Sequence, residues 1–283
     1  MAGSIVLCPT PLGNLEDITL RTIRTLRECD AVFAEDTRVA HRLLRHLNIS
    51  KPLHSFHEGV ERARLATLRT LLGAGKKVAL VTDAGMPGIS DPGVDVVRAA
   101  REAGARVELL PGPSAALAAI VLSGFDGAHF RFDGFPPRKV GERQRYLAAL
   151  RDETLPVVWF ESTHRVLDLL RDVALTLPTR RLFVLREYTK KFEQHIFGDA
   201  AAVIAQLTEV RGEFSLVLDG AEEQAAQPLD SAALQQAAGV LRAAGAKTRD
   251  IVEALRLATG RGKNELYRIV SDDAPQGESR HRP

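Results

Sequence analysis

Residues 77–93 read KVALVTDAGMPGISDPG and join an apolar stretch to a loop rich in glycine, proline and aspartate. The apolar part, Lys77 to Thr82, has the length and the β-branched residues of a buried strand. Similar short runs that end in such loops occur at residues 4–8, 31–34 and 106–110. Amphipathic helical periods at residues 18–26 and 65–72 lie between these runs, which indicates a mostly parallel sheet covered by helices.

A second sheet is expected further along the chain. The turn-rich stretch SGFDGAHFRFDGFPPRK, residues 123–139, interrupts the first pattern and marks a domain junction. The strands expected after it are residues 157–161, 182–187, 192–197 and 214–218. We therefore predict an N-terminal α/β domain over residues 1–122 and a second α/β domain over residues 123–220.

The composition changes after Asp219, where DGAEEQAAQPLD has the polar, alanine-rich character of a linker. Three short helical segments follow, at residues 231–244, 247–258 and 262–270. They predict a small module of helix-turn-helix type over residues 231–271, with seven basic and three acidic residues between Arg242 and Arg268. The polar residues 272–283 are expected to form a disordered tail.

Length and composition exclude several classes of protein. The chain has 283 residues, 45% of them hydrophobic, which is enough to bury two cores. It has no apolar run of the roughly 20 residues that a membrane helix needs. Its two cysteines, Cys8 and Cys29, lack the spacing of a zinc site or a disulfide framework. We expect a cytoplasmic protein that has no membrane contact and no metal.

The basic residues are clustered, although the net charge is only +2. No acidic residue lies between Thr37 and Lys51, and this segment contains Arg38, His41, Arg42, Arg45, His46 and Lys51. A second run has Glu142 as its acidic residue and contains Arg138, Lys139, Arg143, Arg145 and Arg151. Each run alone is also compatible with a solvated helix face. Together they favour a polyanionic partner.

Three of the expected strand ends carry unusual loops, PTPLGN at residues 9–14, DAGMPGISDPG at 83–93 and PGPSA at 111–115. Open α/β sheets bind ligands outside the carboxyl ends of their strands. Glycine lets a ligand approach the backbone, proline holds a loop in one shape, and Ser114 is placed to open a helix. Ordinary turns use the same residues. Three such loops favour a ligand site, although none matches the glycine fingerprint of a dinucleotide or triphosphate site.

Eight segments occur in the order seen in the tetrapyrrole methylase superfamily, and they resemble in particular its ribosomal RNA small subunit methyltransferase I branch. They are PTPLGNLEDITLR (9–21), AEDTR (34–38), DAGMPGISDPG (83–93), PGPSA (111–115), FDGFPPRK (132–139), ESTHR (161–165), REYTKKFE (186–193) and RGEFSLVLDG (211–220). The resemblance extends from about Ser4 to Gly220. The helical C-terminal segment is also similar to that of this branch.

The resemblance implies an α/β fold of the two-domain, tetrapyrrole-methylase-like type (class III methyltransferases), with a C-terminal helical module. It implies S-adenosylmethionine as cofactor, bound in the cleft between the two α/β domains. The implied contacts of the cofactor are Asp83, Ala84, Gly85, Met86, Pro87, Gly88, Pro111, Gly112, Pro113, Ser114, Glu161, Ser162, Arg186 and Glu187. The chain departs from the branch at three positions: Met86 replaces a Thr, Thr163 replaces a Pro, and Tyr188 replaces an apolar residue.

The resemblance further implies 2′-O-methylation of a cytidine in the decoding region of 16S ribosomal RNA, within the assembled small subunit, by a homodimer. A sulfonium methyl group is already activated, so the protein mainly has to align the ribose hydroxyl. Asp17, Asp36 and His57 are our candidates for the base that takes the hydroxyl proton, with Glu58 and Asp91 as alternatives. Each of the carboxylates is also compatible with a helix cap or a surface charge, and His57 with a structural histidine.

The RNA is expected to enter past the loop at residues 9–14 and the segment 36–38. We predict that Arg21, Arg38, Arg138 and Lys139 bind RNA, because guanidinium and ammonium groups bind phosphate oxygens. Two other functions remain open. A tetrapyrrole methyltransferase would share the fold and the cofactor but would have little use for the basic runs. A non-enzymatic ribosome assembly factor would keep the basic surfaces and would not need the cofactor loops.

Overall fold

The computed structural model of the chain describes residues 3–56, 61–90, 93–222 and 230–271. The chain divides into two compact units, Met1–Ala221 and Glu222–Pro283, and each is described by itself. Within the described ranges, no helix combines the length and the apolar composition that crossing a membrane requires.

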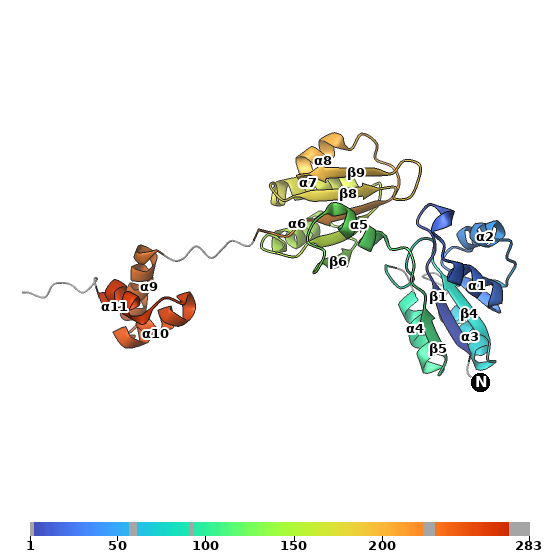
Figure 1. Cartoon of the computed structure of the whole chain (residues 1–283), viewed down its shortest axis with the longest axis horizontal. Coiled ribbons are helices and arrows are strands. Elements are labelled where there is room, and N and C mark those ends of the chain that lie inside the picture. Colours follow the sequence, from blue (N-terminus) through green and yellow to red (C-terminus); the bar gives the residue numbers. More distant parts are fainter. Residues whose placement is uncertain (1–2, 57–60, 91–92, 223–229, 272–283) are drawn as a thin grey trace, which may run out of the picture. The chain divides into compact units, whose positions relative to one another are not determined.

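Among the described residues, five parallel strands form the first sheet, in the spatial order β3-β2-β4-β1-β5. Figure 1 labels β1, β4 and β5 of this sheet. They are β1 (Ser4–Cys8), β2 (Ala31–Ala34), β3 (Leu53–Ser55), β4 (Lys77–Val81) and β5 (Arg106–Leu109). The central strands are almost wholly apolar because helices cover both faces of the sheet. The parallel arrangement brings the carboxyl ends of these strands, with their glycine- and proline-rich loops, to one edge.

Two helices pack on each face of the first sheet. On one face, α1 (Leu20–Glu28) and α2 (Thr37–His46) bury Leu26 and Leu44 against Val6 and Val32. On the other face, α3 (Glu61–Gly73) and α4 (Gly93–Glu102) bury Leu68 and Val96 against Ile5 and Phe33. A mostly parallel sheet covered by helices was the expectation from the sequence, and the structure confirms it for this half.

The second sheet has the spatial order β6-β7-β10-β8-β9 within the described part of the chain. Its strands are β6 (Arg131–Gly134), β7 (Val157–Glu161), β8 (Leu182–Arg186), β9 (Gln194–Gly198) and β10 (Phe214–Leu218). The pair β6 and β7 is parallel and the other pairs are antiparallel. The helices α6 (Val140–Ala149), α7 (Val166–Thr176) and α8 (Ala200–Gln206) pack on one face around the fully buried Trp159.

Helix α5 (Ala115–Ser123) packs on the opposite face of the second sheet, where Ala119 and Ile120 contact Val158 and Val217. The chain therefore passes from one sheet to the other between β5 and α5. The predicted junction, residues 123–139, contains β6, an edge strand of the second sheet. Because α5 packs on the second sheet, we propose that the junction between the two α/β domains lies before Ala115.

The sequence predicted eight strands, and all eight are present. Four of them, β1, β2, β7 and β10, have the expected bounds. The sequence did not predict β3 and β6. β3 is three residues long, and β6 reads RFDG and has an irregular register against β7, so neither shows the apolar run or strict alternation by which strands were recognised.

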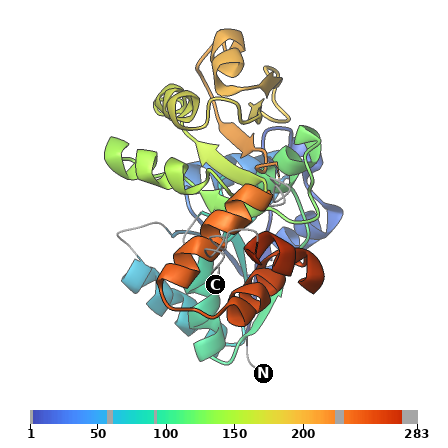
Figure 2. The ribbon, with the colours of Figure 1, turned by 90° about the vertical axis from the view of Figure 1, so that its left-hand side faces the viewer.

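The described part of the second unit, residues 230–271, consists of α9 (Ser231–Ala243), α10 (Thr248–Thr259) and α11 (Lys263–Ser271), drawn in orange to red in Figure 2. They share a core in which Leu234, Ile251, Val252 and Leu266 are buried. Three helices at nearly these bounds were predicted. The tail at residues 272–283 lies outside the described residues.

Candidate functional site

The loops that follow β1 and β4 are fastened to each other at the carboxyl edge of the first sheet. Thr10 N donates to Gly85 O at 3.1 Å, and Gly85 N donates to Thr10 O at 3.0 Å. The hydroxyl of Thr10 donates to Thr82 O at 3.1 Å, and that of Thr82 donates to Gly85 O at 3.2 Å. The turn after β4 is therefore held from two sides, which fits a rigid wall of a binding site.

Glycine is required at two positions of this edge. Gly85 has a φ of +80°, and a Cβ added there would lie 3.1 Å from Leu12 Cδ2. Gly112, after β5, is so close to Pro9 that an added Cβ would lie 2.5 Å from Pro9 Cβ. Both glycines thus allow neighbouring loops to approach each other. Thr10 already pairs with the backbone N and O of Gly85. Gly85 therefore shapes the wall of the site and does not offer its N–H to a ligand.

A cavity of about 480 Å³ lies at this edge, within the size range of small-molecule sites. The first half of the chain contributes Leu12, Glu35, Thr82, Asp83, Ala84, Gly85, Met86, Ile89, Ser90, Ser114 and Ala115. The second half contributes Phe135, Phe160, Glu161, Ser162, Thr163, His164, Gly212, Glu213, Phe214 and Ser215. The loops of both sheets therefore meet around one space with aromatic and polar walls.

Glu161, at the end of β7, presents a buried carboxylate to this cavity. Its Oε1 accepts hydrogen bonds from Ser162 N at 2.7 Å and from Ser162 Oγ at 3.3 Å. Its Oε2 lies 3.0 Å from Arg165 Nη2, but it has no hydrogen bond among the described residues. A buried polar atom without such a bond is unusual in a folded protein. Oε2 is therefore an acceptor suited to a ligand in the cavity.

Three side chains fix the backbone of the loop before β10, which lines the cavity. Arg186 Nε donates to Arg211 O at 2.7 Å, and Thr163 Oγ1 donates to Gly212 O at 2.8 Å. Glu187 Oε1 accepts from Glu213 N at 3.0 Å. Each of three successive residues, 211 to 213, is thus fixed by a different side chain. This clamp holds one wall of the cavity in place.

The clamp also explains the environment of Glu187. Burial alone would raise the pKa of its carboxyl group, but hydrogen bonds from Lys190 and Glu213 N together lower that pKa. Gly212 has a φ of +91°, and an added Cβ there would overlap the Glu187 carboxyl group. Glu187 is therefore packed directly behind the loop and remains ionised.

Two neighbouring aspartates on the first half have opposite pKa shifts. Asp36 caps α2, accepts from Arg38 N at 2.7 Å and pairs with the Arg38 guanidinium at 2.6 Å, which lowers its pKa to about 2. Asp36 N in turn donates to Asp83 Oδ1 at 3.0 Å. Asp83 is exposed, but partial desolvation of its carboxyl group raises its pKa. Asp36 is therefore charged at neutral pH, whereas Asp83 binds a proton more readily than an ordinary aspartate.

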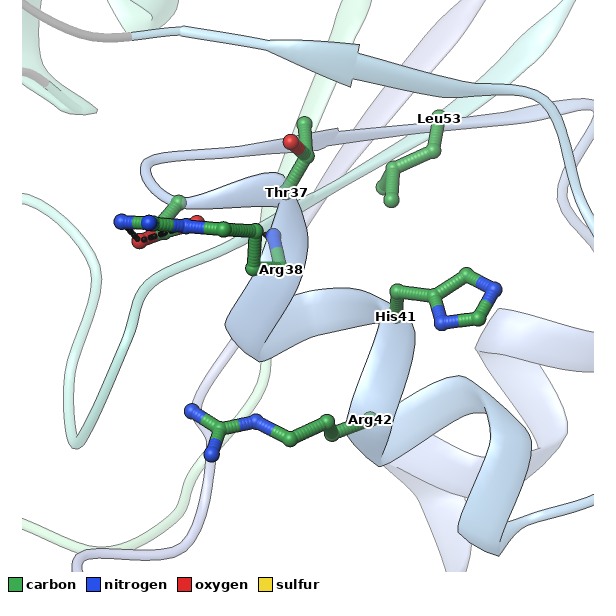
Figure 3. A pocket seen from close by; sticks show the side chains of 6 residues that line it. Thr37, Arg38, His41, Arg42 and Leu53 are labelled. Atoms are coloured by element: carbon green, nitrogen blue, oxygen red, sulfur yellow. Dashed lines mark hydrogen bonds and ion pairs between the residues drawn. The ribbon is translucent and has the colours of Figure 1, made fainter.

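A second, open hollow lies beside α2 and is lined by Asp36, Thr37, Arg38, His41, Arg42 and Leu53. Figure 3 shows Arg38 and Arg42 extending to the same side of the helix, while His41 points away from them. Arg42 has no ion pair with any described residue. This end of α2 therefore presents cations to solvent next to Asp83.

The predicted cofactor contacts divide into two groups. Those that line the cavity are Asp83, Ala84, Gly85, Met86, Ser114, Glu161 and Ser162. Those outside its lining are Pro87, Gly88, Pro111, Gly112, Pro113, Arg186 and Glu187. Ser114 caps α5 and accepts from Leu117 N, as the sequence suggested. Arg186 and Glu187 act on the wall through the loop before β10.

The base candidates are not brought together. Asp17 is exposed in the 3₁₀ helix η1 (Leu15–Asp17) and does not line the cavity. Asp36 is held by Arg38, and a carboxylate with a pKa of about 2 is a weak base. His57, Glu58 and Asp91 lie outside the described residues.

Most of the predicted RNA contacts have partners within the protein. Arg21 is paired with Glu108, Arg38 with Asp36, and Lys139 with Glu142. Arg138 is exposed and directly follows the loop that contributes Phe135 to the cavity. Arg143 belongs to the second basic run, which was expected to face a polyanion. For Arg143 this expectation is wrong, because its side chain is buried and pairs with Asp172 at 2.6 Å.

The sequence reasoning missed several lining residues. Phe135, Phe160, Thr163, His164 and the segment 212–215 were not assigned to the site. Most of them lie within the quoted segments FDGFPPRK, ESTHR and RGEFSLVLDG, directly beside strands of the second sheet. Phe135, Thr163 and His164 follow the carboxyl ends of β6 and β7, where a ligand site is expected, whereas residues 212 and 213 precede β10 and carry no such signal.

Comparison with known proteins identifies the family. The profile of the Tetrapyrrole (Corrin/Porphyrin) Methylases matches residues 4–204. The chain belongs to this family. It is 43% identical over 222 residues to the ribosomal RNA small subunit methyltransferase I of Thermotoga maritima, covering 78% of this chain and 100% of that protein. It is 38% identical over 274 residues to the protein of that name from Neisseria meningitidis serogroup B, covering 95% and 94%.

Solved structures share the fold at low sequence identity. The uroporphyrin-III-C-methyltransferase of Thermus thermophilus has a TM-score of 0.56 and 21% identity, covering 77% of this chain and 94% of that chain. A diphthine synthase has a TM-score of 0.60 and 12% identity, covering 77% and 90%. The expected two-sheet fold of class III methyltransferases is thereby confirmed. This chain is a methyltransferase, and its cofactor is S-adenosylmethionine.

The three departures from the branch pattern each have a definite place in the structure. Met86 lines the cavity, and Thr163 donates the hydrogen bond to Gly212 O. Tyr188 packs against the apolar cluster under α5. Two of the three therefore alter the wall of the cavity itself, and Thr163 adds a hydroxyl donor that proline does not have.

Proposed function

We propose that this methyltransferase methylates the ribose 2′-hydroxyl of a ribosomal RNA nucleotide, namely a cytidine in the decoding region of 16S RNA within the small subunit. The observation that carries the proposal is a cofactor-sized cavity whose rim continues into the basic end of α2. The relatives named ribosomal RNA small subunit methyltransferase I, at up to 43% identity, support RNA as the acceptor.

The lining of the cavity fits S-adenosylmethionine in its chemistry. Phe135 and Phe160, with ring centroids 6.1 Å apart, offer aromatic surface to an adenine ring. Glu161 Oε2 offers an acceptor for an amino or hydroxyl group of the ligand. The loop from Thr82 to Met86 and the hydroxyl of Ser114 form the facing wall. The bound cofactor supplies a methyl group that is already activated by a sulfonium.

The residues of this chain then have to bring the acceptor hydroxyl to that methyl group and hold it there. Orientation of two reactants can lower a barrier by about 7–11 kcal/mol, so the rigidity of the walls matters for the rate. The pairing of Thr10 with Gly85 fixes one wall, and the clamp on residues 211–213 fixes the other. Both walls are therefore built to hold their shape.

The basic residues of α2 favour a polyanion over a small tetrapyrrole. The helix buries Ala40, Leu43 and Leu44 and exposes Arg38, His41, Arg42, Arg45 and His46. Its first turn is joined to the cavity by the hydrogen bond from Asp36 N to Asp83. Phosphates on either side of a nucleotide in the cavity are the natural ligands of such cations.

The proposal is tested with labelled S-adenosylmethionine and three acceptors: small ribosomal subunits, protein-free 16S RNA and a uroporphyrin-type tetrapyrrole. Subunits from a strain that lacks the gene should become labelled at one cytidine, and mass mapping should place the methyl group on its 2′-oxygen. Label on the tetrapyrrole alone would make the chain a tetrapyrrole methyltransferase. Tight ribosome binding without any label would make it an assembly factor.

We further propose that the enzyme is a cytoplasmic homodimer. The edge strand β5 exposes Leu109, and α5 exposes Leu117, Val121 and Leu122. Exposed apolar side chains on an edge strand and on a helix are typical of surfaces that associate. Light scattering of the purified protein should give twice the mass of 30.9 kDa. Replacing Val121 by Glu should reduce that mass to the monomer.

A further inference from the structure

We propose that Asp83 accepts the proton of the acceptor hydroxyl during methyl transfer; this rests on the proposed 2′-O-methylation. The sequence assigned Asp83 to cofactor binding, and the structure gives this residue surroundings that suit a base. It is the second residue after β4, at the carboxyl edge of the first sheet, and it lines the cavity.

The two oxygens of Asp83 have different surroundings. Oδ1 accepts the hydrogen bond from Asp36 N at 3.0 Å, which fixes the direction of the carboxylate. Oδ2 makes no hydrogen bond to any described residue. A carboxylate that is oriented through one oxygen and open at the other can receive a proton from a ligand in the cavity.

The other carboxylates that line the cavity have a cation beside them or another interaction within the protein. Glu161 is buried beside Arg165, and Glu213 is paired with Lys190 at 3.1 Å. Glu35 also has an interaction within the protein. A nearby cation stabilises the ionised carboxylate and makes it a poorer base. Asp83 forms no ion pair with a described residue, although the charges of Arg38 and Arg42 act on it.

Desolvation is the largest effect on Asp83 and raises its pKa, whereas the hydrogen bond from Asp36 N and the charges of Arg38 and Arg42 act in the opposite direction. Asp36 stays anionic next to it, because Arg38 lowers the pKa of Asp36 to about 2, and this negative charge adds to the effect of desolvation on Asp83. The other charged or titratable groups on the elements around it are Glu35, Arg38, Arg42, Glu161, His164 and Glu213. Two carboxylates whose pKa values are pushed apart are a recurrent acid–base arrangement in enzymes.

The proton and electron balance of the step is simple. The 2′-oxygen forms a bond to the methyl carbon while the bond between that carbon and sulfur breaks. The sulfur keeps the electron pair and becomes a neutral thioether. The hydroxyl proton passes to Asp83 Oδ2, and solvent removes it after the product leaves.

The test compares Asp83→Asn with wild type. Asparagine keeps an oxygen that can accept from Asp36 N, so the fold should be retained, while the ability to take a proton is lost. We expect kcat to fall about 100- to 10,000-fold, as for the loss of a general base. Calorimetry should show S-adenosylmethionine affinity within about twofold of wild type, because the amide has the shape of the carboxylate and keeps its accepting oxygen. Asp168→Asn, an exposed aspartate on α7, is the matched control and should remain fully active.

A second readout does not depend on activity. Carbon NMR of the aspartate carboxyl groups in the free protein, assigned with Asp83→Asn, should show Asp83 titrating above the ordinary value of 3.8. Wild-type kcat should fall as the pH drops through this pKa, and Asp83→Asn should lack that dependence. Wild-type rates in Asp83→Asn, a loss of cofactor binding, or a His164→Ala variant that alone abolishes the pH dependence would each overturn the proposal.

The two proposals can fail separately. A wild-type enzyme that methylates a different acceptor would refute the proposed function, and the Asp83 comparison would then be made with that acceptor. A wild-type enzyme that methylates the cytidine while Asp83→Asn does so equally well would refute the role of Asp83 alone.

Discussion

Thr10 and Gly85 are paired through both of their backbone polar groups, at 3.1 and 3.0 Å, although they are 75 positions apart in the sequence. This pairing joins the loop after β1 to the loop after β4. Because Leu12 and Gly85 both line the cavity, a change at Gly85 should act on the binding wall as well as on the backbone.

Replacing Gly85 by Val should abolish or strongly weaken S-adenosylmethionine binding. A side chain at a φ of +80° is strained, and its Cβ would lie 3.1 Å from Leu12 Cδ2. The strain should lower the free energy of unfolding by about 1–3 kcal/mol. Gly104→Val is the control, because Gly104 has a φ of +65° and open space around an added Cβ. Thermal melts and calorimetry on both variants separate strain from contact; a Gly85 variant that melts lower but binds normally contradicts this role.

Replacing Thr163 by Val should weaken cofactor binding without unfolding the protein. Valine has nearly the same shape but cannot donate to Gly212 O, so the clamp on residues 211–213 loses one of its members. A hydrogen bond of this kind contributes about 0.5–1.5 kcal/mol, which corresponds to about a two- to tenfold loss of affinity. Thr70→Val removes a hydroxyl bond to Ala66 O on α3 and should leave the affinity unchanged. Equal cofactor affinity in Thr163→Val and wild type would show that the clamp does not shape the site.

The first sheet could be predicted from the sequence because parallel strands buried on both faces have a clear apolar signal. The strand KVALV of β4 is an example, and its following loop was correctly placed at the cavity. The roles of Arg186 and Glu187 could not be predicted in the same way. Their side chains hydrogen-bond to backbone atoms of residues 25 or more positions away. No local sequence pattern predicts such long-range contacts.

The same limit applies to charge. The sequence shows that Arg143 lies in a basic run, but burial of its guanidinium depends on Asp172, which lies on another helix. Asp36 was a reasonable candidate base from its position after β2. Its pKa of about 2 follows from the hydrogen bonds that the Arg38 side chain donates to it. The sequence shows that Asp36 and Arg38 are close along the chain, but it does not show that their side chains pair.

The contribution of Asp36 to stability should depend on pH. Its folded pKa of about 2 lies below the ordinary value of 3.8, so its stabilising effect is fully present above pH 3.8 and is lost as the pH falls towards 2. Asp36→Asn keeps a good helix cap but removes the charge. Urea denaturation of both proteins should therefore show a stability difference near pH 6 that shrinks between pH 4 and pH 2. A difference that is constant over this range would contradict the pairing with Arg38.

Breaking the buried pair of Arg143 and Asp172 should destabilise the second half of the first unit. Arg143→Met leaves the Asp172 carboxylate buried without its cation and should cost about 3–5 kcal/mol of unfolding free energy. The double variant Arg143→Met/Asp172→Leu should recover much of this loss, since no buried charge remains. In the exposed pair of Asp168 and Arg171, Arg171→Met should cost at most about 1 kcal/mol. Equal losses at the two sites in urea denaturation would contradict the importance of burial.

The cations of the helical unit should contribute to RNA affinity in proportion to the phosphates they neutralise. Lys247, Arg249, Lys263 and Arg268 are exposed and have no ion pair with a described residue, whereas Arg256 is paired with Glu253 at 2.7 Å. Replacing the four unpaired cations by Ala should weaken RNA binding and flatten its salt dependence by about 0.7–0.9 in slope for each phosphate that is no longer neutralised. The control Glu253→Ala/Arg256→Ala leaves the net charge unchanged and should bind RNA like wild type.

Filter binding at several salt concentrations measures the RNA affinity and its salt dependence, and calorimetry should show unchanged cofactor affinity. If the fourfold variant keeps the wild-type salt slope, the helical unit does not dock RNA through these residues, and a role in association or stability would be favoured.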